Sequence, residues 1–176
     1  MNYYHTTSMK INLWDRSLHL MNTWVKKYQL KLSKIYSKTK LLWVGNGPLV
    51  NEVKKTLEAK GLLKNVIFTG VRSDVNMLLQ AMDVFIFPSY YEGLGIVALE
   101  AQATGLPTFC SEAVPKEAGI TEYCHFLPLG DYAKWAKIIL DTHQIRKDMY
   151  KEIVKSGYDV NETSKYLQEF YLSHWK

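Results

Sequence analysis

Short apolar runs alternate with amphipathic segments along most of this 176-residue chain. The apolar runs predict buried strands at residues 41–44, 65–69, 84–87, 106–111 and 124–127. Apolar residues at helical spacing predict helices at residues 17–36, 48–60, 73–82, 94–104, 131–142, 145–156 and 161–176. Residues 1–10 are expected to form an irregular arm, although residues 9–14 are also compatible with a short first strand.

This alternation of strands and helices predicts the α/β class. Strands joined by helices form a parallel sheet through right-handed crossovers, so we expect a single Rossmann-like sheet with helices on both faces. The length suits one domain, residues 1–176, with one hydrophobic core. Ligands of such sheets bind at the carboxyl ends of the strands. The loops Gly45–Pro48, Gly70–Ser73 and Ser89–Gly95 are expected to meet at that edge.

The stretch Asp83–Gly105 combines an apolar strand, a glycine loop and a largely apolar helix. Gly93 and Gly95 let the backbone turn sharply and approach a ligand closely. The composition of the helix predicts that it is buried, and its one carboxylate, Glu100, would then need a partner. Helical side chains lean toward the N-terminus, so Glu100 is expected to face the mouth bordered by Glu92. The N–H groups of the first turn form an anion site there, and this arrangement suits a sugar nucleotide.

The segment EGLGIVALE, from Glu92 to Glu100, resembles the E-x7-E signature of retaining glycosyltransferases of the GT-B fold, in family 4 or "group 1". The motifs VGNGPL, VIFTG, AMDVFIFPS and TGLP follow the family's order, so the similarity extends from about Leu41 to Leu129. The motif KEAGIT at residues 116–121 is most similar to the exopolysaccharide and capsule branch. The resemblance implies the C-terminal, nucleotide-sugar-binding half of a GT-B enzyme.

The resemblance also implies roles for individual residues. Glu100 would accept the ribose hydroxyls, and Glu92 would contact the donor sugar as a catalytic residue. The other implied donor-binding positions are Gly93, Leu94, Gly95, Ile96 and Val97 at the diphosphate, Gly45 and Gly47 in the nucleotide pocket, Val71 and Arg72 at the base, and Ser89. Taken without the resemblance, Gly45–Gly47 is compatible with a plain turn, Arg72 with a surface charge, Ser89 with a strand terminator and Glu92 with an exposed loop carboxylate.

The chain departs from the family's pattern near its N-terminus. The second domain of these enzymes begins with a strand, a G-R turn and a K-N pair, whose Arg and Lys bind the leaving diphosphate. In INLWDRSLHLMN, Arg16 and Asn22 match this pattern, but Met21 stands at the Lys position and Asp15 replaces the glycine. The segment before Leu41 is too short for a first Rossmann-like domain. We therefore expect the N-terminal acceptor domain to be absent and this chain alone to be incomplete or inactive.

The composition and the charge distribution indicate the cellular compartment and the kinds of partner that are expected. No apolar run approaches the roughly 18 residues of a membrane span, and the N-terminus lacks a signal-peptide core, so a cytoplasmic protein is expected. Cys110 and Cys124 match no metal spacing and are expected to be reduced. The net charge is +5, with its basic excess in residues 1–64. A lysine stripe on the helix at 17–36 indicates a solvated face or peripheral contact with the inner membrane surface, not a nucleic-acid partner.

The resemblance implies transfer of a sugar from a nucleotide sugar, a UDP-sugar in most of the family, with retention, in cell-surface polysaccharide synthesis. No metal cofactor is expected, because helix N–H groups and basic residues neutralise the diphosphate. The alternatives are a non-catalytic nucleotide-sugar-binding or partner subunit and, less favoured by KEAGIT, half of a nucleotide-sugar epimerase.

The C-terminal helix carries an apolar and aromatic stripe, made of Tyr166, Leu167, Phe170, Tyr171, His174 and Trp175. Stripes of this kind are enriched at protein interfaces. We expect the helix to dock on a separate acceptor-domain subunit or to form a homodimer. Folding back beside the helix at 17–36 is the alternative.

Overall fold

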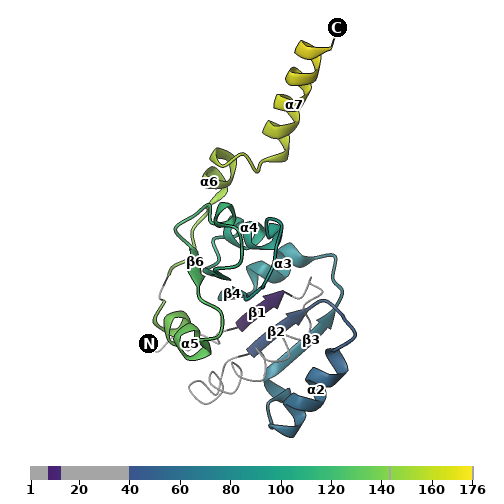
Figure 1. Cartoon of the computed structure of the whole chain (residues 1–176), viewed down its shortest axis with the longest axis vertical. Coiled ribbons are helices and arrows are strands. Elements are labelled where there is room, and N and C mark those ends of the chain that lie inside the picture. The colour runs from purple at the N-terminus through teal and green to yellow at the C-terminus, as the bar shows by residue number, and fades with distance from the viewer. Residues whose placement is uncertain (1–7, 13–39, 143, 176) are drawn as a thin grey trace.

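The computed structural model describes residues 8–12, 40–142 and 144–175. These residues form a six-stranded sheet with the order β3-β2-β1-β4-β5-β6 (Figure 1). Every neighbouring pair of strands in this sheet is parallel, which confirms the predicted α/β class with a Rossmann-like sheet. The strands are β1 (Ser8–Asn12), β2 (Lys40–Val44), β3 (Val66–Gly70), β4 (Val84–Phe87), β5 (Thr108–Ser111) and β6 (Cys124–Leu127).

In the described part of the chain, one helix follows each of β2, β3 and β4, and three more follow β6. They are α2 (Val50–Ala59), α3 (Val75–Gln80), α4 (Ile96–Ala103), α5 (Tyr132–Asp141), α6 (Tyr150–Lys155) and α7 (Val160–His174), with short 3-10 turns at Leu63–Asn65 and Lys116–Ala118. The order therefore follows the predicted alternation closely. The predicted helix at 17–36, its lysine stripe and Arg16 lie outside the described residues.

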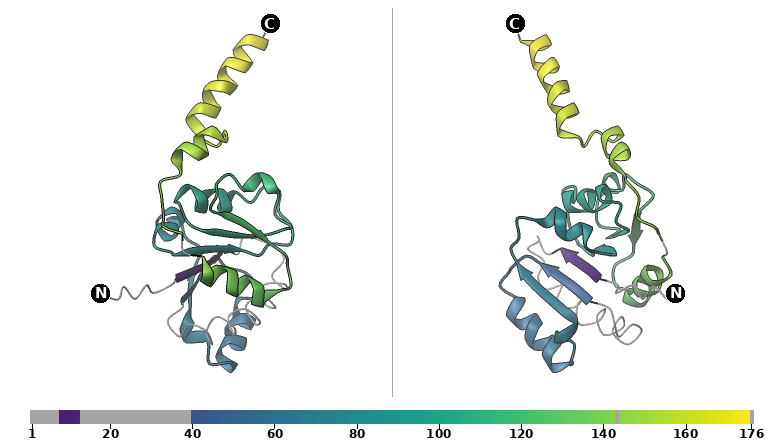
Figure 2. Two further views of the ribbon diagram at one scale, coloured as in Figure 1. Left: turned by 90° about the vertical axis from the view of Figure 1, so that its left-hand side faces the viewer. Right: turned by 180° about the vertical axis from the view of Figure 1, so that it is seen from behind.

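Both faces of the sheet are covered, as predicted. The four residues of β4 alternate between two buried clusters. Val84 and Ile86 pack with residues of α2 and α5, including Leu57 and Trp135. Phe85 and Phe87 pack with residues of α3 and α4. These two helices lie on the opposite face of the sheet from α2 and α5 (Figure 2). Because β4 is buried on both faces, its four consecutive apolar residues were a strong strand signal.

The strand β1 corrects the expected irregular arm at residues 1–10. Its residues Ser8–Asn12 pair with β2 on one side and β4 on the other, which places this strand in the middle of the sheet. Met9, for example, lies opposite Leu41 and Val84. The prediction was wrong for residues 8–10, because SMKIN is short and weakly apolar and pairs only with strands far away in the sequence.

The last two helices also begin at different residues than predicted. The helix predicted at 145–156 begins only at Tyr150, because the segment before it runs as irregular chain beside α3. The helix α7 begins at Val160, with Asp159 as its N-cap, one residue earlier than predicted. It projects away from the sheet and its covering helices (Figures 1 and 2), and none of its described side chains is buried.

Candidate functional site

The topology places the candidate residues at one edge of the sheet. The strand order reverses between β1 and β4, and such a switch point opens a crevice at the carboxyl ends of the strands. The loops that leave β2, β3 and β4 start at this edge. The first two are joined directly, because the Gly45 N–H donates to the Gly70 carbonyl at 2.8 Å. The predicted meeting of these loops is thereby confirmed for β2 and β3.

The loop after β4 ends at Gly95, which precedes the first residue of α4. Its φ of +81° is the left-handed conformation that glycine adopts at little cost. A Cβ atom built there would lie 3.0 Å from Cε1 of Phe87 and 3.4 Å from Cγ1 of Val114, so a side chain would fit only if these neighbours moved by a few tenths of an ångström. The left-handed φ is therefore the main reason for glycine at this position, and the close packing of Phe87 and Val114 adds to it.

The N-terminus of α4 offers donors for an anion. Gly95 has no side chain to cap the helix, and the first intrahelical bond runs from the Ala98 N–H to the Gly95 carbonyl at 2.8 Å. The N–H groups of Ile96 and Val97 therefore have no partner within the helix. Ile96 is 66% exposed, so this turn is open to solvent. An anion bound here would also be stabilised by the helix dipole.

The two carboxylates of the E-x7-E signature differ in burial. Glu92 is half-buried in the loop. The pKa of the nearby Cys110 thiol is raised mainly by its hydrogen bond with Cys124 and by burial, and the charge of Glu92 adds a smaller contribution. Glu100 is exposed on α4. The argument that Glu100 is a costly buried carboxylate was therefore wrong, because the short helix buries only its inner face. Its exposure leaves the carboxylate accessible to a ligand.

Ser89 shapes the loop after β4. This buried residue donates from Oγ to the Tyr91 carbonyl at 3.1 Å. Its own carbonyl accepts a hydrogen bond from Oγ of Ser111, at the end of β5. Ser89 thus holds the backbone that leads to Glu92, and these contacts agree with its reading as the residue that ends the strand.

The loop after β3 carries Val71 and Arg72. Val71 is 79% exposed, so it does not belong to the core. Arg72 donates from Nε and Nη2 to the two carboxylate oxygens of Asp74, at 2.8 and 2.6 Å. Hydrogen bonds and charge in this pair raise the pKa of Arg72 and lower the pKa of Asp74. The geometry favours the surface-charge interpretation of the Arg72 side chain and leaves the loop backbone for ligand contacts.

Gly45 and Gly47 lie in the turn between β2 and α2. The Gly47 N–H donates to Oδ1 of Asn46 at 2.9 Å, and its carbonyl accepts from the Val50 N–H at 3.2 Å. These bonds form a tight strand-to-helix turn, so the structure agrees with the plain-turn interpretation as well as with a pocket wall.

The loop from Ser111 to Thr121 also borders this site, and it was not among the loops predicted from the sequence. Val114 in this loop is buried against Gly95, and Lys116 places its Nζ 3.8 Å from the ring centroid of Phe126. The KEAGIT motif was the available signal, but it served only to place the chain in a branch of the family.

No metal centre can be assigned to the described part of the chain. Within residues 8–12, 40–142 and 144–175, no group of three His, Cys, Asp or Glu side chains could hold a metal ion. Cys110 and Cys124 are free thiols whose sulfur atoms are 3.9 Å apart.

A cavity of about 540 Å³ between residues 119–122 and 147–152 is lined by none of the predicted site residues. No helix that the structure describes is long and apolar enough to cross a membrane.

Comparison with known proteins decides the family. Residues 15–144 match the family described as "Glycosyl transferases group 1". The chain belongs to the group 1 glycosyl transferases. The resemblance drawn from the E-x7-E signature and the ordered motifs is thereby confirmed.

One curated relative and two solved structures of similar fold show how much of such a protein the chain represents. The putative glycosyltransferase EpsF of Bacillus subtilis (strain 168) is 31% identical over 128 residues, which cover 69% of this chain and 33% of EpsF. Anabaena Alr3699/HepE, solved with UDP and glucose, has a TM-score of 0.71 at 18% identity, covering 94% of this chain and 48% of that one. The C-terminal domain of LpcC, a glycosyl transferase group 1 family protein of Francisella tularensis, has a TM-score of 0.64 at 17% identity, covering 85% of each chain.

The chain thus spans a third of the curated relative EpsF and about half of the larger solved structure. Its fold corresponds to the C-terminal domain of a group 1 glycosyl transferase, one half of the GT-B fold. In this group 1 domain, the motif residues from Glu92 to Glu100 surround the N-terminus of α4 at the switch point of the sheet.

Proposed function

We propose that this chain binds the donor of a retaining glycosyltransferase, a UDP-sugar, at the carboxyl edge of its sheet. The observation that carries the proposal is the open N-terminus of α4, flanked by Glu92 in the preceding loop and by the accessible Glu100 in the helix. Phosphate groups suit the N–H donors, and hydroxyl groups suit the carboxylates. The likeness to Alr3699/HepE, which was solved with UDP and glucose, supports the same donor class.

The proposed chemistry follows from this arrangement. When the bond between the sugar and the diphosphate breaks, negative charge grows on the diphosphate. The N–H groups and the dipole of α4 are aimed at that charge and would stabilise the transition state. Glu92 would contact the donor sugar, Glu100 would hold the ribose, and Arg16, outside the described residues, would add positive charge. No metal ion is required in this scheme.

We also propose that the acceptor is bound by a separate surface, in cell-surface polysaccharide synthesis. The chain spans only a third of EpsF, so the reaction of a complete group 1 enzyme needs more surface than the chain provides. Transfer requires that both substrates are held together. The apolar stripe on α7 is a suitable docking surface for an acceptor domain. Peripheral membrane contact through the lysine stripe stays a prediction, because these residues lie outside the described part.

Titration calorimetry with UDP tests the proposed donor site. The wild-type chain is expected to bind UDP weakly. Glu100→Ala should weaken binding by about 1.5–3 kcal/mol, or roughly tenfold or more in Kd, because the ribose loses hydrogen bonds to a charged group. Glu58→Ala is the matched control, since Glu58 is an exposed carboxylate on α2, and it should bind UDP like the wild type.

Two outcomes contradict the proposal. One is a wild-type chain that does not bind UDP or a UDP-sugar. The other is unchanged UDP affinity in a Glu100→Ala variant with an intact circular dichroism spectrum. A chain that binds the donor but shows no transfer with any acceptor subunit would favour the non-catalytic binding subunit instead.

A further inference from the structure

A fully buried amide side chain lies between α4 and the loop that follows β5. Gln102 is 0% exposed, although it belongs to a helix that is otherwise buried through small and apolar residues. A buried amide is costly unless its donors and acceptor are satisfied. The partners of this side chain therefore indicate what it does.

Every polar atom of the Gln102 amide is hydrogen-bonded. Nε2 donates to the carbonyl of Ala98 at 2.9 Å and to that of Ala118 at 2.6 Å. Oε1 accepts from the N–H groups of Ile120 and Thr121, both at 3.1 Å, and from Oγ1 of Thr121 at 3.0 Å. One bond stays within α4 and four reach the loop. The side chain thus holds residues 118–121 against the helix.

The same loop is attached to the donor site at two earlier points. Oγ of Ser111 donates to the Ser89 carbonyl, in the loop that leads to Glu92. Val114 is 1% exposed and packs against Gly95, the residue before α4, on the side where a side chain would project. The loop therefore packs on the turn that presents the N–H groups of Ile96 and Val97, and Gln102 holds its far end.

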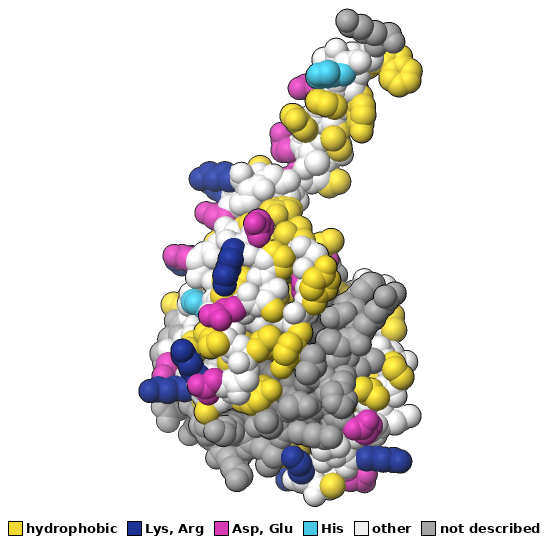
Figure 3. Space-filling model, in the orientation of Figure 1, with side chains coloured by type: hydrophobic (Ala, Val, Ile, Leu, Met, Phe, Trp, Pro, Cys, Tyr) yellow, Lys and Arg dark blue, Asp and Glu magenta, His cyan; other side chains and the backbone are white. Residues whose placement is uncertain are grey.

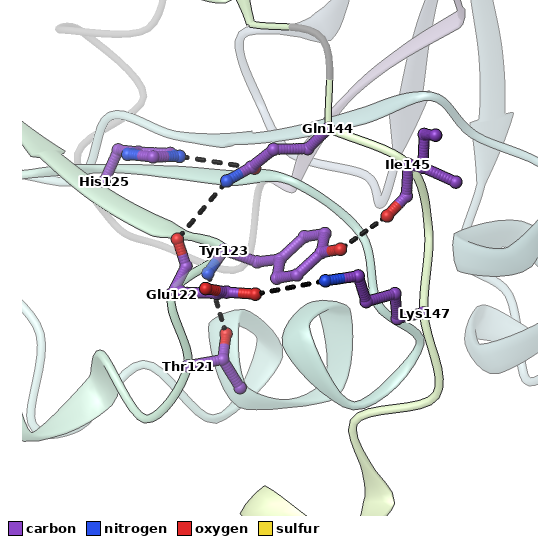
Figure 4. A network of polar contacts seen from close by, with 7 residues as sticks. All are labelled: Thr121, Glu122, Tyr123, His125, Gln144, Ile145 and Lys147. Carbon is purple, nitrogen blue, oxygen red and sulfur yellow. Dashed lines mark hydrogen bonds and ion pairs between the residues drawn. The ribbon is translucent and has the colours of Figure 1, made fainter.

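The chain beyond the loop is also anchored, as Figure 4 shows. The Tyr123 hydroxyl donates to the Ile145 carbonyl at 2.5 Å, and Nε2 of Gln144 donates to the Glu122 carbonyl at 3.4 Å. Nζ of Lys147 lies 3.6 Å from Oε1 of Glu122 and forms an ion pair with it. Because the loop is held on this side by other contacts, loss of Gln102 is expected to release residues 114–121 without unfolding the domain.

We propose that Gln102 is a positioning residue for the donor site, one that never touches the donor. It holds the loop 111–121, and through Val114 the loop sets the position of Gly95 and of the first turn of α4. The inference rests on the proposed function, since it assigns the N-terminus of α4 to the diphosphate. Gln102 then affects the recognition of diphosphate and leaves the recognition of the nucleoside unchanged.

The experiment compares UDP with uridine on the intact chain. Gln102→Leu removes the amide at similar volume and should raise the Kd for UDP about tenfold, equal to about 1.4 kcal/mol, with the Kd for uridine unchanged. A merely destabilised domain would lose affinity for both ligands in the same proportion. The amides of Ile120 and Thr121 should also lose protection from hydrogen exchange, which nuclear magnetic resonance measures without any ligand.

Two further variants complete the design. Thr121→Val removes one of the hydrogen bonds to Oε1 of Gln102 and takes the place of Gln102→Leu if that variant does not fold. It should change the ratio of the Kd for UDP to the Kd for uridine in the same direction as Gln102→Leu, but by a smaller factor. Thr104→Val is the control, because Thr104 is the C-cap residue of α4 and its hydroxyl donates to the Ala101 carbonyl at 2.8 Å, with no hydrogen bond to the loop among the described residues. It should leave both Kd values unchanged.

The results separate this inference from the proposed function. A wild-type chain that does not bind UDP overturns both. A wild-type chain that binds UDP, with the same ratio of UDP to uridine affinity in Gln102→Leu and Thr121→Val, overturns the positioning role alone.

Discussion

The side chain of Arg146 joins two parts of the fold that are far apart in the sequence. Its guanidinium donates to three carbonyls at the end of α3, those of Gln80, Leu79 and Met82, at 2.9, 3.1 and 2.5 Å. The last carbonyls of a helix lack intrahelical partners, so a cation there satisfies them. Burial lowers the pKa of Arg146, yet the group stays charged at neutral pH. Arg146 thereby holds the irregular segment before α6 against α3.

Replacing Arg146 should destabilise the domain. Arg146→Met keeps the aliphatic part of the side chain but removes the charged donor from all three carbonyls, although the Leu79 carbonyl keeps the Met82 N–H at 3.4 Å. We expect the free energy of unfolding to fall by about 1.5–3 kcal/mol, the usual range for hydrogen bonds to a charged group. Chemical denaturation followed by fluorescence measures this change.

The neighbouring residue provides the control. Lys147→Met also removes a charge, but the Lys147 pair with Glu122 is exposed at 3.6 Å. Such pairs contribute about 0–1 kcal/mol, so little change is expected. Equal losses in the two variants would show that Arg146 is only a surface charge.

At the residue scale, local motifs were predictable and distant contacts were not. The turn before α4 was predicted because it depends on a local residue, Gly95, whose φ is +81°, whereas Gly93 has no positive φ. Gln102 was missed because its loop partners lie 16 to 19 positions away in the sequence and meet it only in the folded chain. The exposure of Glu100 was also missed, because an apolar composition does not tell which face of a short helix is open.

At the scale of an element, α7 depends on its own sequence for stability. None of its described side chains is buried, so packing within the described chain adds little. Its N-terminus is capped by Asp159, whose Oδ1 accepts from the N–H groups of Asn161 and Glu162 at 3.0 and 3.1 Å. Its Oδ2 accepts from the Tyr150 hydroxyl at 3.0 Å. The hydrogen bonds from the Glu162 N–H and from Tyr150 lower the pKa of Asp159.

This cap predicts a loss of α7 helicity in acid. A carboxyl group whose pKa is lower in the folded state stabilises that state above its unfolded pKa of about 4. The stabilisation is lost as the pH falls through the lower, folded pKa. Circular dichroism at 222 nm should therefore show helix loss below about pH 4. The amide resonances of Asn161 and Glu162 should shift over the same range.

Asp159→Asn separates the cap from general acid unfolding. Asparagine also caps helices but does not titrate, so the local change should become smaller. Glu169→Gln is the control, because Glu169 is an exposed carboxylate on the same helix and should leave the profile as in the wild type. A wild-type profile in Asp159→Asn would mean that the cap does not control the helix.

Elements were predictable where their own pattern was strong. The continuous apolar run of β4 and the amphipathic pattern of α5 identified both correctly. The strand β1 was uncertain because its position between β2 and β4 comes from pairing, not from its composition. The start of α6 was misplaced because contacts of Arg146 hold the preceding segment outside the helix.

At the scale of the whole molecule, the helix α7 extends from the α/β body as a separate arm. Its apolar side chains remain uncovered along its length (Figure 3), with Tyr166, Phe170 and Trp175 at 65%, 43% and 85% exposure. The rings of Tyr166 and Phe170 lie 6.3 Å apart, and those of Phe170 and His174 lie 4.4 Å apart, so the stripe forms one continuous surface. Contiguous aromatic surface of this kind favours a protein interface. The described part of the domain does not cover the stripe, and the helix at 17–36, which the alternative arrangement places beside it, lies outside the described residues.

We therefore predict that the isolated chain self-associates through α7 when no acceptor domain is present. Light scattering should show an apparent mass that rises with concentration. Phe170→Glu combined with Trp175→Glu should give a monomer with an unchanged melting temperature, because these side chains cover no part of the core. Lys165→Gln combined with Gln168→Glu changes the net charge equally outside the stripe, so this control should associate like the wild type. A wild-type chain that stays monomeric, together with a melting temperature that falls sharply in the Phe170→Glu, Trp175→Glu variant, would show that the stripe belongs to the chain's own core.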